Sequence, residues 1–319
     1  MNYRSMGRSG LKLSEIALGA WLTFGEQIDE ATATGLVHRA YDRGVNYFDN
    51  ADVYASGRAE EVMGRAIRDL PRAALVVSSK VFWPSMPGPN GRGLSRKHIF
   101  ESIHASLKRL GTDYLDLYFC HRYDPDTPFE ETVRVMDDLV RQGKVLYWGT
   151  SEWSGSQIAD AHRRARYLGA YPPAVEQPHY NMLVRKVVET DLVATADRLG
   201  FGLVTWSPLR SGLLSGKYNE AKPKQARLAR KEYSWLSEVL TEENLGKSRA
   251  LGQLARDLGV SQAQLAIGWL LRLPQVSSVI TGATESAQLE DNLGAIDVPA
   301  KLTPAVLTRI EDILANKPA

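Results

Sequence analysis

Four side chains that could together protonate a substrate oxygen lie at or near the ends of three predicted strands. Asp49 ends the strand-like run VNYFD, and Tyr54 follows five residues later. Lys80 lies inside the run LVVSSKV, and His121 follows YLDLYFC. A free phenol, with a pKa of about 10, is a weak acid at neutral pH, and a nearby cation stabilises its phenolate. These residue types therefore predict a general-acid site built on Tyr54.

Lys80 is predicted to lie one or two positions inside its strand, below the strand end. Burial there would favour the neutral amine unless a carboxylate offsets it, and Asp49 on the neighbouring strand can do so. Taken singly, each residue also has a structural interpretation: tyrosines pack, strand-end aspartates cap helices, and a lone histidine is often a satisfied structural group. Their joint placement at strand ends favours the catalytic interpretation.

The elements that must position these residues alternate between strand and helix along the whole chain. Residues 1–14 resemble a β-hairpin, and a helix capped by Asp29 follows the first buried strand. The pattern predicts an α/β fold, a (β/α)8 TIM barrel, as a single domain over residues 1–319. An open doubly wound sheet is the structural rival, but it needs a glycine-rich turn after its first strand, and Gly19-Ala20-Trp21-Leu22 stands there. The eight predicted strands are 16–19, 45–49, 75–81, 114–121, 145–151, 174–177, 202–207 and 277–282.

In such a barrel the functional residues lie at the C-terminal ends of the strands. Ser151, Gln177 and Ser207 also fall at predicted strand ends, beside the four residues above. Two long connections are expected near them, one over residues 82–93 and one after strand 7, over residues 209–243. The second is rich in Lys and Arg, and so long a connection is typical of a functional flap or a disordered insert.

Composition excludes several classes of function. The chain has 319 residues, 44% of them apolar and 24% charged, and a formal net charge of +2, which gives no nucleic-acid or membrane signal. The pair Arg163-Arg164 is interpreted as a solvated helix face. Cys120 is the single cysteine, so no intrachain disulfide is possible, and we interpret it as a packing thiol. The N-terminus lacks a signal-peptide core, and we expect a cytoplasmic protein without a metal site.

Motifs along almost the entire chain resemble the aldo-keto reductases, most closely the branch of the potassium-channel β-subunits and their bacterial relatives. The resemblance implies an NADP(H)-dependent barrel reductase with a catalytic tetrad of Asp49, Tyr54, Lys80 and His121. The matching stretches are LGAWLTFG, YFDNADVYASGRAEEVMG, VVSSKVFW, GLSRKHI, SLKRLGTDYLDLYFCHRYDPDTPFEETV, YWGTSEWS, EQPHYNM, TWSPLRSGLLSGKY and SSVITGATESAQLEDNLGAI.

The resemblance also implies where NADPH or NADP+ would lie. Ser151 and Gln177 would hold the nicotinamide carboxamide, with the ring near Trp21. A guanidinium and hydroxyl groups at a helix start suit the adenosine 2′-phosphate. The other implied cofactor-binding residues are Trp206, Ser207, Leu209, Ser211 and Lys217 along the pyrophosphate, Arg227, Thr284, Gln288 and Asn292 toward the adenosine, and also Asp49 and Gly282.

The implied reaction is hydride transfer from NADPH to a carbonyl carbon, with Tyr54 as general acid. Small or aryl aldehydes and ketones are expected as substrates, methylglyoxal-like dicarbonyls among them. The expected substrate-binding residues are Trp21, Tyr54, Trp83 and His121, and further candidates for the mouth of the site are Phe24, Trp153 and Tyr180.

Two rival functions remain. One is an NADPH-binding regulatory or accessory subunit with little turnover, and the other is a hydrolase or lyase using Asp49 and Glu176. His121 matches the enzymes of the family, whereas some channel subunits have asparagine there, which favours a working catalyst. The resemblance further suggests a homo-oligomer, a tetramer or larger.

Two residues depart from the family pattern. Glu152 stands where the channel branch often has arginine, and a carboxylate there could accept from the carboxamide or turn away. Asp291 replaces a more usual glutamate beside Asn292, which would weaken its contact with the adenine.

Overall fold

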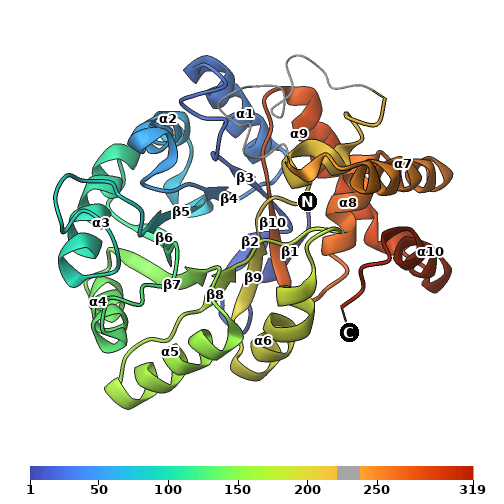
Figure 1. Cartoon of the computed structure of the whole chain (residues 1–319). Coiled ribbons are helices and arrows are strands. Elements are labelled where there is room, and N and C mark those ends of the chain that lie inside the picture. The colour runs from blue at the N-terminus through green and yellow to red at the C-terminus, as the bar shows by residue number, and fades with distance from the viewer. Residues whose placement is uncertain (221–237, 319) are drawn as a thin grey trace.

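Eight parallel strands close into a barrel with helices around it in the computed structural model, which describes residues 1–220 and 238–318 (Figure 1). The strands pair in the order β10-β3-β4-β5-β6-β7-β8-β9, so each pairs with its neighbour in the chain and the last closes on the first. The predicted (β/α)8 barrel is therefore confirmed. The barrel strands are β3 (Ile16–Gly19), β4 (Tyr47–Asp49), β5 (Val76–Val81), β6 (Leu115–Cys120), β7 (Val145–Ser151), β8 (Val175–Gln177), β9 (Gly202–Thr205) and β10 (Val276–Thr281).

Helices return the chain from the end of each strand to the start of the next. The first begins after Asp29, whose carboxylate accepts from the Thr32 N–H at 2.7 Å, as the sequence predicts. Helices such as α3, α4 and α5 bury an apolar stripe, which includes Ile99 and Ile103 on α3, Val133 and Met136 on α4, and Ile158 and Ala161 on α5. The helices are α1 (Glu30–Asp42), α2 (Arg58–Ile67), α3 (Arg96–Leu110), α4 (Phe129–Arg141), α5 (Gly155–Leu168), α6 (Val193–Leu199), α7 (Glu242–Asp257), α8 (Gln262–Leu270), α9 (Ser286–Leu293) and α10 (Pro304–Leu314).

The predicted N-terminal hairpin closes one end of the barrel. Strands β1 (Tyr3–Ser5) and β2 (Lys12–Ser14) pair antiparallel. Met6 and Leu13 are fully buried and pack with side chains of the barrel interior, such as Tyr47 and Phe119. Burial of these side chains stabilises the barrel. Because the hairpin fills the N-terminal end, the mouth at the C-terminal ends of the strands is left for a site.

The connection after β9 differs from the prediction. It begins with a short 3-10 helix (Arg210–Ser215), and α7 starts at Glu242. The helices α7 and α8, which follow, were not among the predicted elements. Both lie on the same side of the barrel as α10 (Figure 1). Arg227, predicted to bind the 2′-phosphate, lies outside the described residues.

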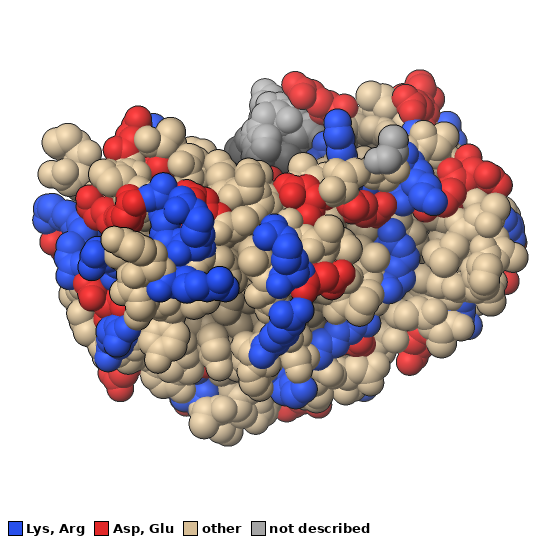
Figure 2. All heavy atoms as spheres, turned by 90° about the horizontal axis from the view of Figure 1, so that it is seen from below, with Lys and Arg blue, Asp and Glu red and all other residues tan. Residues whose placement is uncertain are grey.

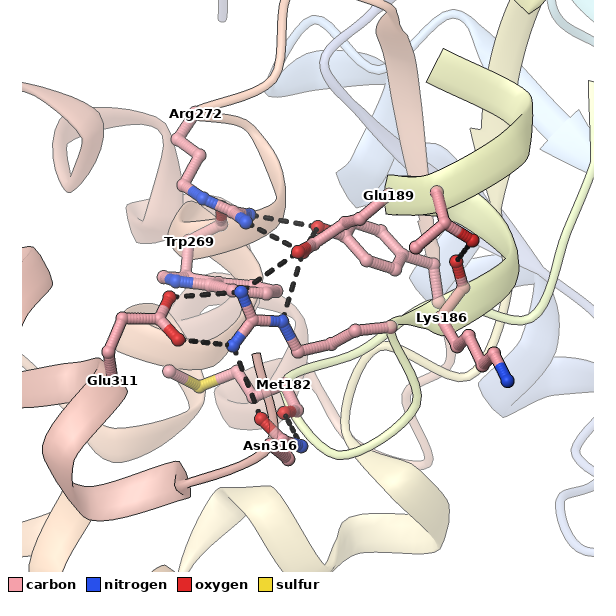
Figure 3. A network of polar contacts seen from close by, with 10 residues as sticks. Met182, Lys186, Glu189, Trp269, Arg272, Glu311 and Asn316 are labelled. Atoms are coloured by element: carbon pink, nitrogen blue, oxygen red, sulfur yellow. Dashed lines mark hydrogen bonds and ion pairs between the residues drawn. The ribbon is translucent and has the colours of Figure 1, made fainter. Parts of the chain in front are cut away.

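A buried arginine anchors the C-terminal helix to the segment after β8 (Figure 3). Arg185 forms two hydrogen bonds to Glu189, at 3.1 and 2.8 Å, and two to Glu311 of α10, at 2.7 and 2.9 Å. Arg272 donates to the same Glu189 and stacks 3.4 Å from the centre of the Trp269 ring. Two-pronged arginine–carboxylate pairs fix geometry as well as charge. The network therefore holds α10 in place beside the loop that follows β8.

The outer surface mixes charges of both signs. On the face seen in Figure 2, Lys and Arg side chains lie among Asp and Glu side chains. On α5, Arg163 pairs with Asp160, and Arg164 pairs with Asp160 and Glu130, which confirms that this arginine pair belongs to a solvated helix face.

Within residues 1–220 and 238–318, no helix has the length and apolarity needed to span a membrane. Cys120 is buried in the core, as expected of a packing thiol.

Candidate active site

A buried ion pair lies at the floor of the barrel mouth. Lys80, on β5, is fully buried, and its ammonium lies 2.7 Å from Asp49 Oδ2 at the end of β4. The same ammonium donates to the Asn50 carbonyl at 2.6 Å. Burial is the largest single effect on the pKa of Lys80 and lowers it, but Asp49 and Tyr54 together raise it by more, so the pKa lies above its ordinary value. Lys80 is therefore a fixed cation at neutral pH, as the sequence predicts.

The second oxygen of Asp49 is held by three further donors. Ser78 donates to Oδ1 at 2.8 Å, the Gln177 amide at 3.0 Å and the Tyr47 hydroxyl at 3.2 Å. Residues 78 and 80 share a face of β5, and residues 47 and 49 share a face of β4, as strand alternation requires. The carboxylate is thus locked in one orientation, with its other oxygen directed at Lys80.

Tyr54 lies beside this pair. It begins a short 3-10 helix (Tyr54–Gly57), and its hydroxyl accepts a hydrogen bond from the Lys80 ammonium at 3.2 Å. Burial raises the pKa of the Tyr54 phenol, and the positive charge of Lys80 lowers it by a smaller amount. The expectation that the pair makes the phenol more acidic than usual is thus not met in this structure. Lys80 instead offsets part of the effect of burial, and Tyr54 carries its proton at neutral pH.

His121 follows β6 and faces Tyr54. The two ring centres are 6.0 Å apart with the rings near perpendicular, and the Trp83 ring lies 6.4 Å from the imidazole. Burial, Lys80 and Arg122 together hold the pKa of His121 well below its usual value. The imidazole is therefore neutral at neutral pH, and one of its nitrogens carries a proton that it can donate. Nδ1 is buried and has no hydrogen-bond partner among the described residues.

A cleft of about 870 Å³ opens above these groups. Tyr54, Asp49 and His121 line it, while Lys80 lies buried beneath. Every predicted cofactor residue within the described parts of the chain also lines it. These residues are Trp21, Asp49, Ser151, Gln177, Trp206, Ser207, Leu209, Ser211, Lys217, Gly282, Thr284, Gln288 and Asn292. The structure therefore brings together in one cleft groups from all parts of the sequence.

Strained backbone gathers around the same cleft. Leu22, Ala55, Ser207 and Ser211 line it with φ between 49° and 60°, a region that residues other than glycine seldom adopt. Glu152, directly after the cleft residue Ser151, has φ 59°. Such conformations cost of order 1–3 kcal/mol each and cluster at functional sites.

Several predicted positions need correction. Phe24, Trp153 and Tyr180 do not line the mouth but are buried in the core, because Trp153 packs against Tyr123 and Phe129, and Tyr180 against Trp269. Trp83 does line the cleft.

Glu176 does not join Asp49 in the cleft. It is fully buried on the opposite face of β8 from Gln177, where Thr150 Oγ1 donates to it at 2.5 Å. The hydrolase alternative based on Asp49 and Glu176 therefore lacks its second carboxylate. Among the described residues, no three His, Cys, Asp or Glu side chains gather as metal ligands.

Other cleft residues were missed by the sequence analysis. Arg122 and Glu285 line the cleft, and Tyr47 and Ser78 hold Asp49 from below. Strand alternation could have placed Tyr47 and Ser78 on the side of Asp49 and Lys80. Arg122 and Glu285 lie in connecting segments, where no periodic pattern indicates the direction of a side chain.

Comparison with known proteins decides the family. A model of the aldo/keto reductase family matches residues 15–315. The chain belongs to the aldo/keto reductase family. Membership supports an oxidoreductase function and agrees with the predicted barrel. A probable voltage-gated potassium channel subunit beta of Arabidopsis thaliana is 51% identical over 322 aligned residues, which cover 100% of this chain and 98% of the relative. A protein of the same description from Oryza sativa subsp. japonica is 49% identical over 322 aligned residues, which again cover 100% of this chain and 98% of the relative.

The structure also shows where the two residues that the sequence analysis singled out, Glu152 and Asp291, direct their side chains. The Glu152 carboxylate turns to the Trp206 indole and the His179 backbone. Asp291 accepts from the Ser261 hydroxyl at 3.0 Å and lines the cleft beside Asn292.

A second buried acid lies two residues before Tyr54. Asp52 is 2% exposed, and its carboxylate lies near the Ser85 and Ser102 side chains but forms no hydrogen bond of ordinary geometry with the described residues. Burial and the nearby Glu60 raise the pKa of Asp52 to about 7, against an opposing effect of Arg109. Glu60 itself is held by Arg109 at 2.6 Å and Ser79 at 2.5 Å. Asp52 therefore keeps its proton up to about neutral pH.

We expect Asp52→Asn to stabilise the protein above pH 7. The pKa of Asp52 in the folded protein lies above its value in the unfolded chain, so the protonated carboxyl favours the folded state. This contribution to the free energy of unfolding is complete below about pH 4 and is lost as the pH rises to about 7. Asparagine cannot ionise, so the variant should gain up to about 4 kcal/mol at pH 8 and little at pH 4. Denaturant midpoints measured from pH 4 to pH 8 would show it. Glu176, with a pKa raised to about 8 by burial, leaves some pH dependence in the variant.

The exposed Asp69→Asn change is the matched control and should leave the pH dependence of stability unchanged. If Asp52→Asn is no more stable than the parent chain at pH 8, Asp52 does not resist ionisation in the folded state.

Proposed function

We propose that this chain is an NADP(H)-dependent reductase that converts aldehydes and ketones to alcohols. The observation that carries the proposal is the position of one ammonium group. Lys80 Nζ lies 2.7 Å from Asp49 and 3.2 Å from the Tyr54 hydroxyl, at the floor of a cleft that a substrate can enter. A fixed cation beside a protonated phenol suits the donation of a proton to an oxygen that gains negative charge.

Each residue has a distinct role in this proposal. Tyr54 donates its hydroxyl proton to the substrate oxygen as that oxygen becomes an alkoxide. The Lys80 ammonium stabilises the phenolate that remains, and Asp49 keeps Lys80 charged and in place. The neutral imidazole of His121 donates a hydrogen bond that orients the carbonyl. Bound NADPH would supply the hydride.

The cleft residues fit a dinucleotide of this kind. Ser151 and Gln177, at the ends of β7 and β8, offer a hydroxyl and an amide beside the ion pair for the nicotinamide carboxamide. Lys217 offers a positive charge on the pyrophosphate side. Thr284 and Gln288, around the start of α9, would take the adenosine 2′-phosphate.

A fluorescence titration with NADPH and NADH tests the cofactor assignment. NADPH should bind more tightly than NADH, because the Thr284 hydroxyl and the start of α9 offer hydrogen-bond donors to the extra phosphate. A chain that binds neither nucleotide would contradict the proposed function. Equal affinities would overturn the assignment of the 2′-phosphate site while leaving the reductase chemistry to a separate test.

The second candidate function is a nucleotide-binding accessory subunit with little turnover. It is favoured by two relatives, each about half identical to this chain, that are described as probable voltage-gated potassium channel beta subunits. An NADPH-oxidation assay with 4-nitrobenzaldehyde separates the two. Turnover supports the reductase, whereas retained NADPH without turnover supports the accessory subunit.

Substrate and assembly complete the proposal. The aromatic side chains of Trp21 and Trp83 on the cleft wall suit small or aryl carbonyls, methylglyoxal-like dicarbonyls included. We also infer a cytoplasmic homo-oligomer, a tetramer or larger, which light scattering of the purified protein would test.

A further inference from the structure

The indole of Trp206 forms part of the cleft wall directly after β9. Its ring stacks on His179, with centres 4.3 Å apart and planes 19° apart, and meets the edge of Trp21 at 5.6 Å and 90°. Both indoles line the cleft. The direction of the Trp206 ring therefore sets the shape of the cleft between the ends of β9 and β3.

One carboxylate oxygen fixes this indole. Glu152 Oε1 accepts the Trp206 Nε1–H at 2.9 Å and the His179 backbone N–H at 2.5 Å. Glu152 directly follows β7, His179 lies two residues beyond β8, and Trp206 directly follows β9. A single oxygen atom thus joins the ends of three consecutive strands. Hydrogen bonds to a charged acceptor are stronger than those between neutral groups.

The backbone conformation of Glu152 also indicates that its side chain is held in a specific direction. Its φ of 59° lies in the left-handed region, which is unfavourable for a glutamate. This conformation accompanies the two hydrogen bonds that direct the side chain across the ends of β8 and β9, beside the cleft.

The stacking partner is held in a fixed state as well. Burial, Arg210 and Arg122 lower the pKa of His179 to about 4, so its ring is neutral at neutral pH. Asn181 donates its side-chain amide to His179 Nε2 at 3.1 Å, so the ring proton lies on Nδ1. The same Asn181 amide donates to the Ser207 carbonyl at 3.0 Å. Asn181 thus joins the His179 ring to the residue after Trp206, and Glu152 joins the His179 backbone to the Trp206 indole.

We propose that Glu152 is a positioning residue that holds the Trp206 indole in the cleft wall and so contributes to nucleotide affinity without touching the nucleotide. Its consequence for binding rests on the proposed function, but its effect on the indole does not. A glutamine at this position keeps the acceptor oxygen, and an alanine removes it. The two substitutions therefore separate the hydrogen bond from the charge.

The test is a double-mutant cycle on NADPH affinity. Glu152→Ala should weaken binding roughly 3- to 20-fold, and Glu152→Gln by less than about 3-fold. In a Trp206→Phe background, where the indole N–H is gone, most of the effect of Glu152→Ala should disappear. The exposed Glu61→Ala change on α2 controls for loss of a negative charge and should leave affinity unchanged.

A second readout needs no nucleotide. The indole N–H resonance of Trp206, assigned by its absence in Trp206→Phe, should shift in Glu152→Ala and stay close to its original position in Glu152→Gln. An unchanged indole resonance, or equal effects of Glu152→Ala in both backgrounds, would overturn the positioning role. Failure of the parent chain to bind NADPH would instead overturn the proposed function and leave the indole readout valid.

Discussion

Replacing Tyr54 with phenylalanine should lower kcat for carbonyl reduction by about 10²–10⁴, the usual contribution of a positioned acid. The substitution removes one oxygen atom, which lies 3.2 Å from the Lys80 ammonium, and keeps the ring beside His121. Lys80 retains its bonds to Asp49 and to the Asn50 carbonyl. The floor of the site should therefore stay in place, and NADPH affinity should change little.

Two measurements on the same variant check this prediction. Turnover with 4-nitrobenzaldehyde should fall, while the Kd for NADPH from fluorescence stays near that of the parent chain. Tyr123→Phe is the matched control, because Tyr123 packs against Phe129 and Trp153 outside the cleft. Near-full turnover in Tyr54→Phe would show that another group supplies the proton.

Replacing Lys80 with methionine should abolish most activity and also destabilise the fold. Methionine fills similar space but leaves Asp49 charged and buried without its cation, which typically costs about 3–5 kcal/mol. Turnover should fall by at least the 10²–10⁴ that we expect for Tyr54→Phe, because the phenolate would lose the charge that stabilises it. Denaturant unfolding and the turnover assay measure the two effects separately.

A second substitution distinguishes loss of charge balance from loss of chemistry. In the Asp49→Asn/Lys80→Met double variant neither member of the pair leaves a buried charge, so part of the lost stability should return. Activity should not return, because the cation beside Tyr54 is still missing. If Lys80→Met keeps both stability and turnover, the ion pair is not the basis of the site.

Much of the fold follows from local signals in the sequence. The strands over residues 16–19 and 145–151 have the predicted bounds. The helix α10 also has a clear local start signal, a Thr303 cap followed by Pro304. The missed helices α7 and α8 also carry readable caps, at Thr241 and at Ser261 with Gln264. The predicted strand at 202–207 ends earlier, at Thr205, because the chain turns at Ser207, whose φ is 56°.

The candidate site is predictable in part for a physical reason. Asp49, Lys80 and His121 occupy strand ends or the position next to them, and a closed parallel barrel brings all strand ends to one rim. Trp153 and Tyr180 were misplaced because an aromatic residue near a rim can equally pack inward, and tertiary contacts decide which. The direction of Glu152 depends on an unusual backbone conformation that no sequence pattern signals. The balance between burial and charge at Tyr54 likewise needs coordinates.

The most direct test of the proposed chemistry is a single-turnover experiment on the parent chain. Protein carrying one equivalent of bound NADPH is mixed with excess 4-nitrobenzaldehyde, and the fluorescence of the reduced nicotinamide is followed. We predict that one equivalent of NADPH is oxidised and one equivalent of the alcohol appears. Bound NADPH that survives this aldehyde and a panel of small and aryl carbonyls would contradict the assignment of the cleft as a reductase site.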